Sequence, residues 1–185
     1  ARTQAVGYNK TLMLAHMVRH RMGDAAFKAG LAAFFERFRF QRATFMDWAR
    51  AMSESADAPL ESFIEAWIQR PGAPALELLA PRQSRDGDRH HLTFELRQAA
   101  PNSLDESFQP FPLAVPVAID LAGEATPIRR VVDLSQGRAR FDESFPRPVT
   151  RLRVDPGFDV FRWLHRDELP PSLGELFGAA EGTII

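Results

Sequence analysis

The sequence changes its periodicity within one stretch, Phe63-Ile64-Glu65-Ala66-Trp67-Ile68-Gln69-Arg70-Pro71-Gly72-Ala73-Pro74. The first half of this stretch carries apolar residues at the spacing of one helical face, and Pro71 and Gly72 then interrupt any helix. Beyond Pro74 the apolar residues alternate with polar ones, which is the period of a half-buried strand. We therefore predict an α+β fold, with a helical part before this stretch and a β part after it.

The helical part is expected to contain about four antiparallel helices, because start and stop signals divide its apolar pattern. The first helix is expected to run from Leu12 to Met22 and to end at Gly23. Asp24 is expected to cap the second helix, a capping box of Thr44 and Asp47 to begin the third, and Pro59 to begin the fourth. The first helix is apolar almost all round as far as Val18 and is expected in a core, and each of the other three has one apolar face, so the helices are expected to pack against one another.

The β part is expected to form a small antiparallel sandwich of about six short strands. Alternation is clearest for residues 92–96 and 113–121, and further strand candidates are residues 76–79, 128–134, 138–141 and 149–154. Pro116 lies inside the best strand, so that strand is expected to be at an edge or to carry a bulge. An irregular tail should follow, with a helical turn around Leu173 to Phe177.

These patterns predict three regions: a helical region at residues 1–70, a β-sandwich at residues 71–156 and a tail at residues 157–185 that leads toward a further domain. The chain opens at Ala1 without an initiator methionine and stops at Ile185 inside an apolar run. We therefore expect it to be an internal fragment of a longer protein.

Composition excludes several classes of function. The formal net charge is −1 and the charged residues are interleaved, so the basic surface of a nucleic-acid-binding protein is not expected. No apolar run reaches the ~18–20 residues of a membrane-spanning helix. Cysteine is absent, which excludes disulfides, thiolate nucleophiles and cysteine-ligated zinc. The sequence gives no indication of the compartment.

Two histidines, His16 and His20, have the i, i+4 spacing that zinc peptidases use on a helix. The zinc peptidase motif needs glutamate directly after the first histidine as the general base, and Met17 occupies that position. No glutamate stands on a following helix as a third ligand. We therefore expect no metal site in this chain. The pair His90-His91 follows Asp86-Gly87-Asp88, which we interpret as a hairpin turn and not as a calcium loop.

Tyr8, the one tyrosine in the chain, stands in Tyr8-Asn9-Lys10-Thr11 just before the first expected helix. This motif resembles the Tyr-x-Lys-Gly motif of aminopeptidase N-type zinc peptidases, which are gluzincins. The run from Leu12 to Val18 and the turn at Met22-Gly23-Asp24 resemble the helix and the turn that follow it in that family. Residues 63–74 resemble the family's Phe-x-x-x-Trp-x-x-x-Pro-Gly-x-Pro, which joins the catalytic domain to a β-sandwich.

The resemblance implies one catalytic residue, Tyr8, whose hydroxyl would donate to the oxyanion that forms at the scissile carbonyl. Thr11 departs from the family pattern, where glycine is usual. The zinc ligands and the general base precede the tyrosine in that family, so they would lie before Ala1. The intact protein would then be a zinc-dependent aminopeptidase acting on the N-terminus of peptides. The fragment alone would be inactive and would hold no zinc or other cofactor.

In the intact protein the helical region is expected to pack against the missing part of the catalytic domain that holds the zinc site. A second interpretation stays open, in which the helices and the sandwich form a non-catalytic module for protein interaction and Tyr8 is structural. The two differ in what precedes Ala1, because only the first requires a His-Glu-x-x-His motif there.

Overall fold

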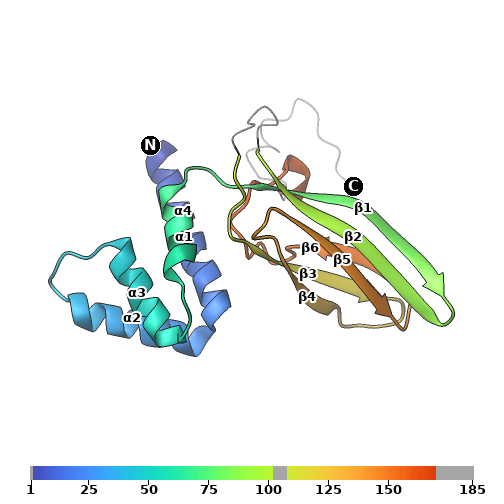
Figure 1. The fold of residues 1–185 in the computed structure, drawn as a ribbon, viewed down its shortest axis with the longest axis horizontal. Helices are drawn as coiled ribbons and strands as arrows, with labels where there is room; N and C mark the ends of the chain where they lie inside the picture. Colours follow the sequence, from blue (N-terminus) through green and yellow to red (C-terminus); the bar gives the residue numbers. More distant parts are fainter. Residues whose placement is uncertain (1, 102–107, 170–185) are drawn as a thin grey trace, which may run out of the picture.

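A computed structural model describes residues 2–101 and 108–169 and places a helical part beside two small antiparallel sheets (Figure 1). The helices are α1 (Arg2–Met22), α2 (Asp24–Phe38), α3 (Phe45–Ala56) and α4 (Glu61–Gln69), followed much later by a 3-10 turn, η1 (Arg166–Glu168). The strands are β1 (Ala75–Asp86), β2 (Arg89–Ala99), β3 (Ala114–Leu121), β4 (Ile128–Asp133), β5 (Arg138–Phe145) and β6 (Val149–Val154). The predicted α+β class is confirmed.

Helix α1 begins far earlier than predicted, at Arg2 and not near Leu12. The preceding residues lack apolar periodicity, so no helix is predicted there from the sequence. They also contain no proline, so the helix can extend toward the N-terminus, because each added residue contributes one more hydrogen bond once a helix exists. Thr11 fits this backbone, since its Oγ1 donates to the carbonyl oxygen of Gly7 at 2.9 Å. Tyr8 therefore lies inside α1 and not before it.

The predicted capping role of Asp24 is wrong. Gly23, with φ 79°, is the N-cap residue of α2, and Asp24 is the first residue of the helix and makes no capping hydrogen bond. The Asp24 carboxylate instead accepts hydrogen bonds from the Arg19 guanidinium at 2.7 and 2.9 Å. Arg19, one turn before the end of α1, thus binds the Asp24 carboxylate, which makes no capping hydrogen bond to α2.

The start of α4 also differs from the prediction, because Leu60 and not Pro59 immediately precedes the helix. A contact with α3 fixes this start. The Leu60 N–H donates to Ser53 Oγ at 2.9 Å, and the Ser53 hydroxyl donates to Glu61 Oε2 at 2.6 Å. A serine from the preceding helix therefore performs the capping that the sequence assigned to local residues.

The predicted capping box at α3 is confirmed. The Asp47 N–H donates to Thr44 Oγ1 at 3.2 Å, and the Thr44 N–H donates to Asp47 Oδ2 at 2.9 Å. These two bonds satisfy backbone donors that the first turn of any helix leaves free.

Replacing Thr44 with alanine is expected to lower the free energy of unfolding by about 1 kcal/mol, the usual cost of losing a threonine N-cap. Thr44→Ser keeps the hydroxyl and should remain close to the wild type. Urea unfolding of the three proteins measures the difference. Equal stability of all three would show that the box contributes nothing.

The six strands form two three-stranded sheets, with orders β1-β2-β5 and β4-β3-β6, and every pair is antiparallel. The predicted alternation is confirmed, since Leu92, Phe94 and Leu96 on β2 are buried, as are the odd-numbered residues of β3 from Val115 to Leu121. Phe94 faces Phe141 of β5 and stacks on it at 4.5 Å between ring centroids. The arrangement is the predicted antiparallel sandwich.

Strand β3 is the central strand of its sheet, so the expectation that Pro116 marks an edge strand is wrong. The Pro116 carbonyl accepts from the Asp155 N–H at 2.7 Å, just beyond the end of β6 at Val154. Because N–H and C=O of one residue point to the same side of a strand, the missing N–H of Pro116 lies where β6 has already ended. Proline therefore costs no ladder bond here. The register irregularity of this pair lies elsewhere, between Asp120 and Leu121.

Trp67 connects the helical part to the sheets. It is fully buried on α4, stacks on Phe111 at 4.4 Å between ring centroids, and donates from Nε1 to the Pro112 carbonyl at 3.3 Å. The buried apolar residues of the helices and of the sheets form one contiguous cluster. The boundary between a separate helical region and a separate β-sandwich at residues 70 and 71 stays a prediction.

The segment after β6 returns to this joint between helices and strands. The Trp163 N–H donates to the Pro74 carbonyl at 2.7 Å, and Val160 and Arg162 are buried. The predicted helical turn around Leu173 to Phe177 lies outside the described residues, and the proposed continuation toward a further domain stays a prediction. Val160 and Arg162 thus anchor this segment to the body of the protein.

Candidate functional site

Tyr8 projects from the second turn of α1 into solvent, and 79% of its surface is exposed. Its hydroxyl has no hydrogen-bond partner among residues 2–101 and 108–169. A tyrosine that merely packs would cover its ring and leave only the hydroxyl wet. The ring of Tyr8 is open as well, so the tyrosine does not stabilise the part of the fold that the structure describes.

An exposed apolar face surrounds Tyr8, and we define it by Tyr8, Leu12, Leu31, Phe34 and Phe45. Leu12 is 68% exposed, and together with Tyr8, Thr11 and Ala15 it lines an open hollow on α1. Thr11 and Ala15 also line the neighbouring groove of about 380 Å³, which Leu31, Phe34 and Phe45 of α2 and α3 complete. The apolar face thus includes residues of three helices, α1, α2 and α3.

Lys10 lies on the opposite side of α1 from Tyr8, since two residues correspond to about 200° of helical rotation. Its Nζ donates to the carbonyl oxygen of Arg70 and, at 3.3 Å, to that of Gly72. It also lies 5.9 Å from the centroid of Trp67. Burial and the positive charge of Arg70 lower the pKa of Lys10. Lys10 therefore ties α1 to the start of the β part, a role that sequence reasoning missed although the lysine belongs to the quoted motif.

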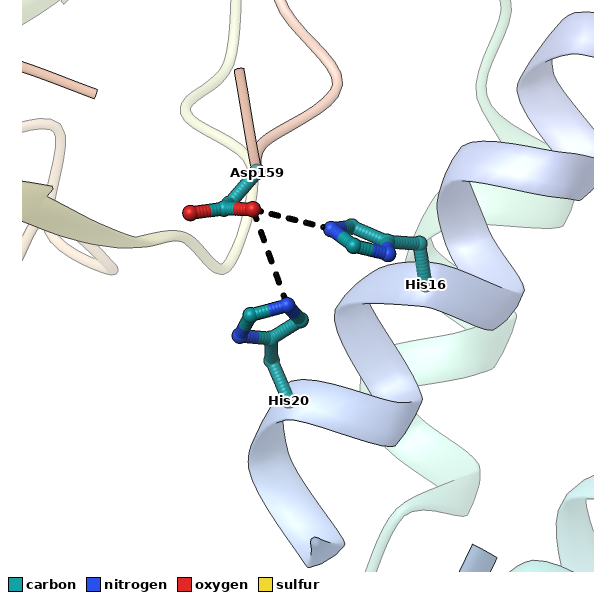
Figure 2. A group of neighbouring side chains, drawn as sticks. All are labelled: His16, His20 and Asp159. Carbon is teal, nitrogen blue, oxygen red and sulfur yellow. Dashed lines mark hydrogen bonds and ion pairs between the residues drawn. The ribbon is translucent and has the colours of Figure 1, made fainter. Parts of the chain in front are cut away.

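His16 and His20 both point toward Asp159, which lies on the segment after β6 (Figure 2). The distances to Asp159 Oδ1 are 3.0 Å from His16 Nε2 and 3.6 Å from His20 Nε2. His16 is partly buried and His20 is exposed, as the sequence suggested for a pair with one packed member. Asp159 could not be predicted from the sequence as their partner, because it is 143 residues away from His16 and not on a helix.

A buried charged network fixes the segment that carries Asp159. Asp155 Oδ1 accepts from the Asp159 N–H at 2.7 Å, and Asp155 Oδ2 accepts from Arg162 Nε at 2.8 Å. Arg162 also donates to Glu168 at 3.0 Å. Burial raises the pKa of Asp155, while the hydrogen bond from Arg162 acts in the opposite direction. Paired and hydrogen-bonded in this way, the network can stay charged inside the protein.

The other polar motifs form ordinary structure. Asp86-Gly87-Asp88 is the turn between β1 and β2, as predicted, with φ 56° at Gly87. His91 Nδ1 lies 3.1 Å from Asp142 Oδ1 on the neighbouring strand, and no second histidine joins this pair within the described residues. These residues therefore present no additional candidate site.

Residues 3–67 match the family described as "Peptidase family M1 domain". The chain is 36% identical over 72 residues to an aminopeptidase N of Lactococcus lactis subsp. lactis, an alignment that covers 39% of this chain and 8% of that protein. It is 24% identical over 157 residues to an aminopeptidase N of Escherichia coli strain K12, which covers 78% of this chain and 18% of that protein. The chain thus spans less than a fifth of the length of either relative.

The fold is similar to that of a solved structure, the aminopeptidase A of Legionella pneumophila in complex with aspartic acid. The TM-score is 0.62, with 17% sequence identity, and the match covers 85% of this chain and 18% of that one. At this identity the likeness supports the fold alone. It extends well beyond residues 3–67, into the β part.

Proposed function

We infer, from the confirmed similarity of residues 3–67 to peptidase family M1 and to aminopeptidase N proteins, that this chain is part of an aminopeptidase. The protein that contains it would hydrolyse the peptide bond at the N-terminus of peptides. The observation that carries this proposal is the family match, which includes Tyr8 and nearly all of the helical part. The β part extends the likeness in fold only.

In this proposal Tyr8 stabilises the oxyanion of the tetrahedral intermediate by donating its hydroxyl proton in a hydrogen bond. Two observations support the role: the hydroxyl has no partner among the described residues, and the side chain lies on an open face. A donor that is not engaged elsewhere needs no bond broken before it can bind the developing negative charge. Lys10 positions α1 from the opposite side.

The aminopeptidase zinc motif does not fit the residues of this chain. His16 and His20 have the required spacing, but Met17 stands where the general base would be, and Asp159 comes from a distant segment rather than from a following helix. We therefore place the catalytic zinc ligands and the general base in residues that precede Ala1 in the intact protein. No catalytic step is assigned to a metal within this chain.

The apolar face is proposed to be the surface against which the zinc-site part of the catalytic domain packs. It carries the candidate catalytic residue, and Leu12 and Phe45 on it are 68% and 45% exposed. Contiguous exposed apolar surface of this kind marks an interaction site. Packing there would bring Tyr8 beside the catalytic groups and would cover its ring.

The test is to sequence the gene upstream of the codon for Ala1. We expect an encoded His-Glu-x-x-His motif with a further glutamate ligand downstream of it, and the 185-residue chain alone should have no peptidase activity. An upstream sequence without that motif, joined to the same helical and β parts, would favour the non-catalytic interaction module instead.

A further inference from the structure

The three side chains His16, His20 and Asp159 converge on one point between α1 and the segment after β6 (Figure 2). We propose that they form a binding site for a divalent transition-metal ion, with zinc as the ion that fits best. The sequence predicts no metal site in this chain, because no following helix carries a glutamate as the third ligand. The fold supplies that ligand from a loop.

The spacing of the ligand atoms suits a tetrahedral ion. Zinc binds imidazole nitrogen and carboxylate oxygen at about 2.0–2.1 Å, so two ligand atoms at a tetrahedral angle are about 3.3–3.4 Å apart. The two histidine-to-Asp159 distances, 3.0 and 3.6 Å, lie on either side of this value. One ligand atom from each residue can be chosen so that all lie within 4.8 Å of one another. Small rotations of the side chains are enough to place an ion between them.

The ligands are held by structure that does not depend on an ion. Residues four apart lie on the same face of a helix, so α1 presents His16 and His20 together. Asp159 is fixed by the hydrogen bond from its N–H to Asp155, whose carboxylate is buried against Arg162. A ligand set with a rigid scaffold loses less entropy on binding than a flexible one.

Two residues of the Asp159 segment lie in the left-handed region of backbone conformation. Asp155 and Phe158 have φ values of 48° and 54°, in the left-handed region that aromatic residues seldom enter. Such conformations persist where the surrounding structure imposes them, and they cluster at binding sites.

The composition of the site indicates a transition metal and leaves a position open. Imidazole nitrogen with one carboxylate suits zinc and its neighbours in the first transition row, whereas calcium and magnesium prefer oxygen ligands. The exposed fractions of the three side chains lie between 25% and 54%, so a bound ion would be shielded but reachable by water. A cavity of about 230 Å³ adjoins the site, lined in part by His20, Arg21 and Asp159. Water or a small anion could complete the coordination there.

Metal analysis of the tag-free 185-residue chain, dialysed after exposure to zinc, tests the proposal. We expect one zinc per chain in the wild type and less than a tenth of that in His16→Gln/His20→Gln and in Asp159→Asn. His91→Gln is the matched control, because His91 also contacts an aspartate, Asp142, at 3.1 Å but has no second histidine beside it. The control should bind as much zinc as the wild type.

Gly157→Ala tests the geometry without removing a ligand. A Cβ at residue 157 would lie 2.6 Å from Asp159 Oδ2, so the carboxylate must move, while the backbone there can accept alanine. Loss of a group that orients a metal ligand usually lowers metal affinity about 10–100-fold. Because Gly157→Ala displaces a ligand itself, we expect a zinc affinity loss of at least about tenfold, measured by competition with a chelating dye. Unfolding in the presence of a chelator checks that every variant is folded without the ion. Zinc content well below one per chain in the wild type, or equal in the wild type and the double histidine variant, would overturn the proposal.

Discussion

Replacing Trp67 with alanine is expected to lower the free energy of unfolding by about 3–5 kcal/mol, the usual cost of removing a buried aromatic side chain. Trp67 is fully buried, stacks on Phe111 and contacts Phe63 and Phe161 through its ring edges. The truncation leaves a cavity at the joint between α4 and the sheets, and it also leaves the Pro112 carbonyl without its Nε1 donor. Urea unfolding followed by circular dichroism measures the loss.

Trp163→Ala is the matched control for this prediction. The Trp163 side chain is 57% exposed, and its hydrogen bond to Pro74 comes from the backbone, so alanine retains it. Surface substitutions of this kind usually change stability by no more than about 0.5 kcal/mol. A Trp67→Ala protein as stable as the Trp163→Ala protein would mean that the buried tryptophan does not hold the helices to the sheets.

Local signals predicted most of the fold. Thr44 and Asp47 predicted the start of α3, because a capping box involves only residues three positions apart. The alternation of apolar and polar residues predicted β2 and β3, because one face of each strand is buried in the sandwich core. These features depend on neighbours along the chain, so the sequence alone was sufficient.

Features that depend on distant residues could not be predicted in the same way. The start of α4 is fixed by Ser53 from the previous helix, and Pro116 is tolerated in a central strand only because β6 ends beside it. The contact of His16 with Asp159 spans 143 residues. No pattern along the chain encodes such a meeting, because the relative placement of α1 and the last segment is set by packing around Trp67.

The candidate catalytic residue came from a resemblance and not from its local pattern. Tyr8 was expected just before a helix, whereas the structure places it within α1, with its side chain on the open apolar face. The position inside the helix gives it a defined direction, since Lys10 holds the opposite side of α1 against Arg70 and Gly72. Its role in catalysis stays a proposal.

Tyr8→Phe in the longer protein is expected to lower kcat by about 10²- to 10³-fold, or about 3 to 4 kcal/mol of transition-state stabilisation, with little change in KM. The reason is that a donor aimed at the oxyanion binds the transition state more strongly than the substrate. Phenylalanine keeps the ring, so packing on the apolar face should be preserved. The melting temperature should stay close to that of the wild type, because the hydroxyl has no partner among the residues that the structure describes.

The kcat of Tyr8→Phe relative to wild type, measured together with the melting temperature of both proteins, is the most direct test of the central claim that this chain supplies a catalytic residue to an aminopeptidase. We predict a kcat lower by about 10²- to 10³-fold at an unchanged melting temperature. A normal kcat with a lowered melting temperature would contradict the account. Tyr8 would then be a structural residue that contacts the rest of the protein, and it would have no part in the mechanism.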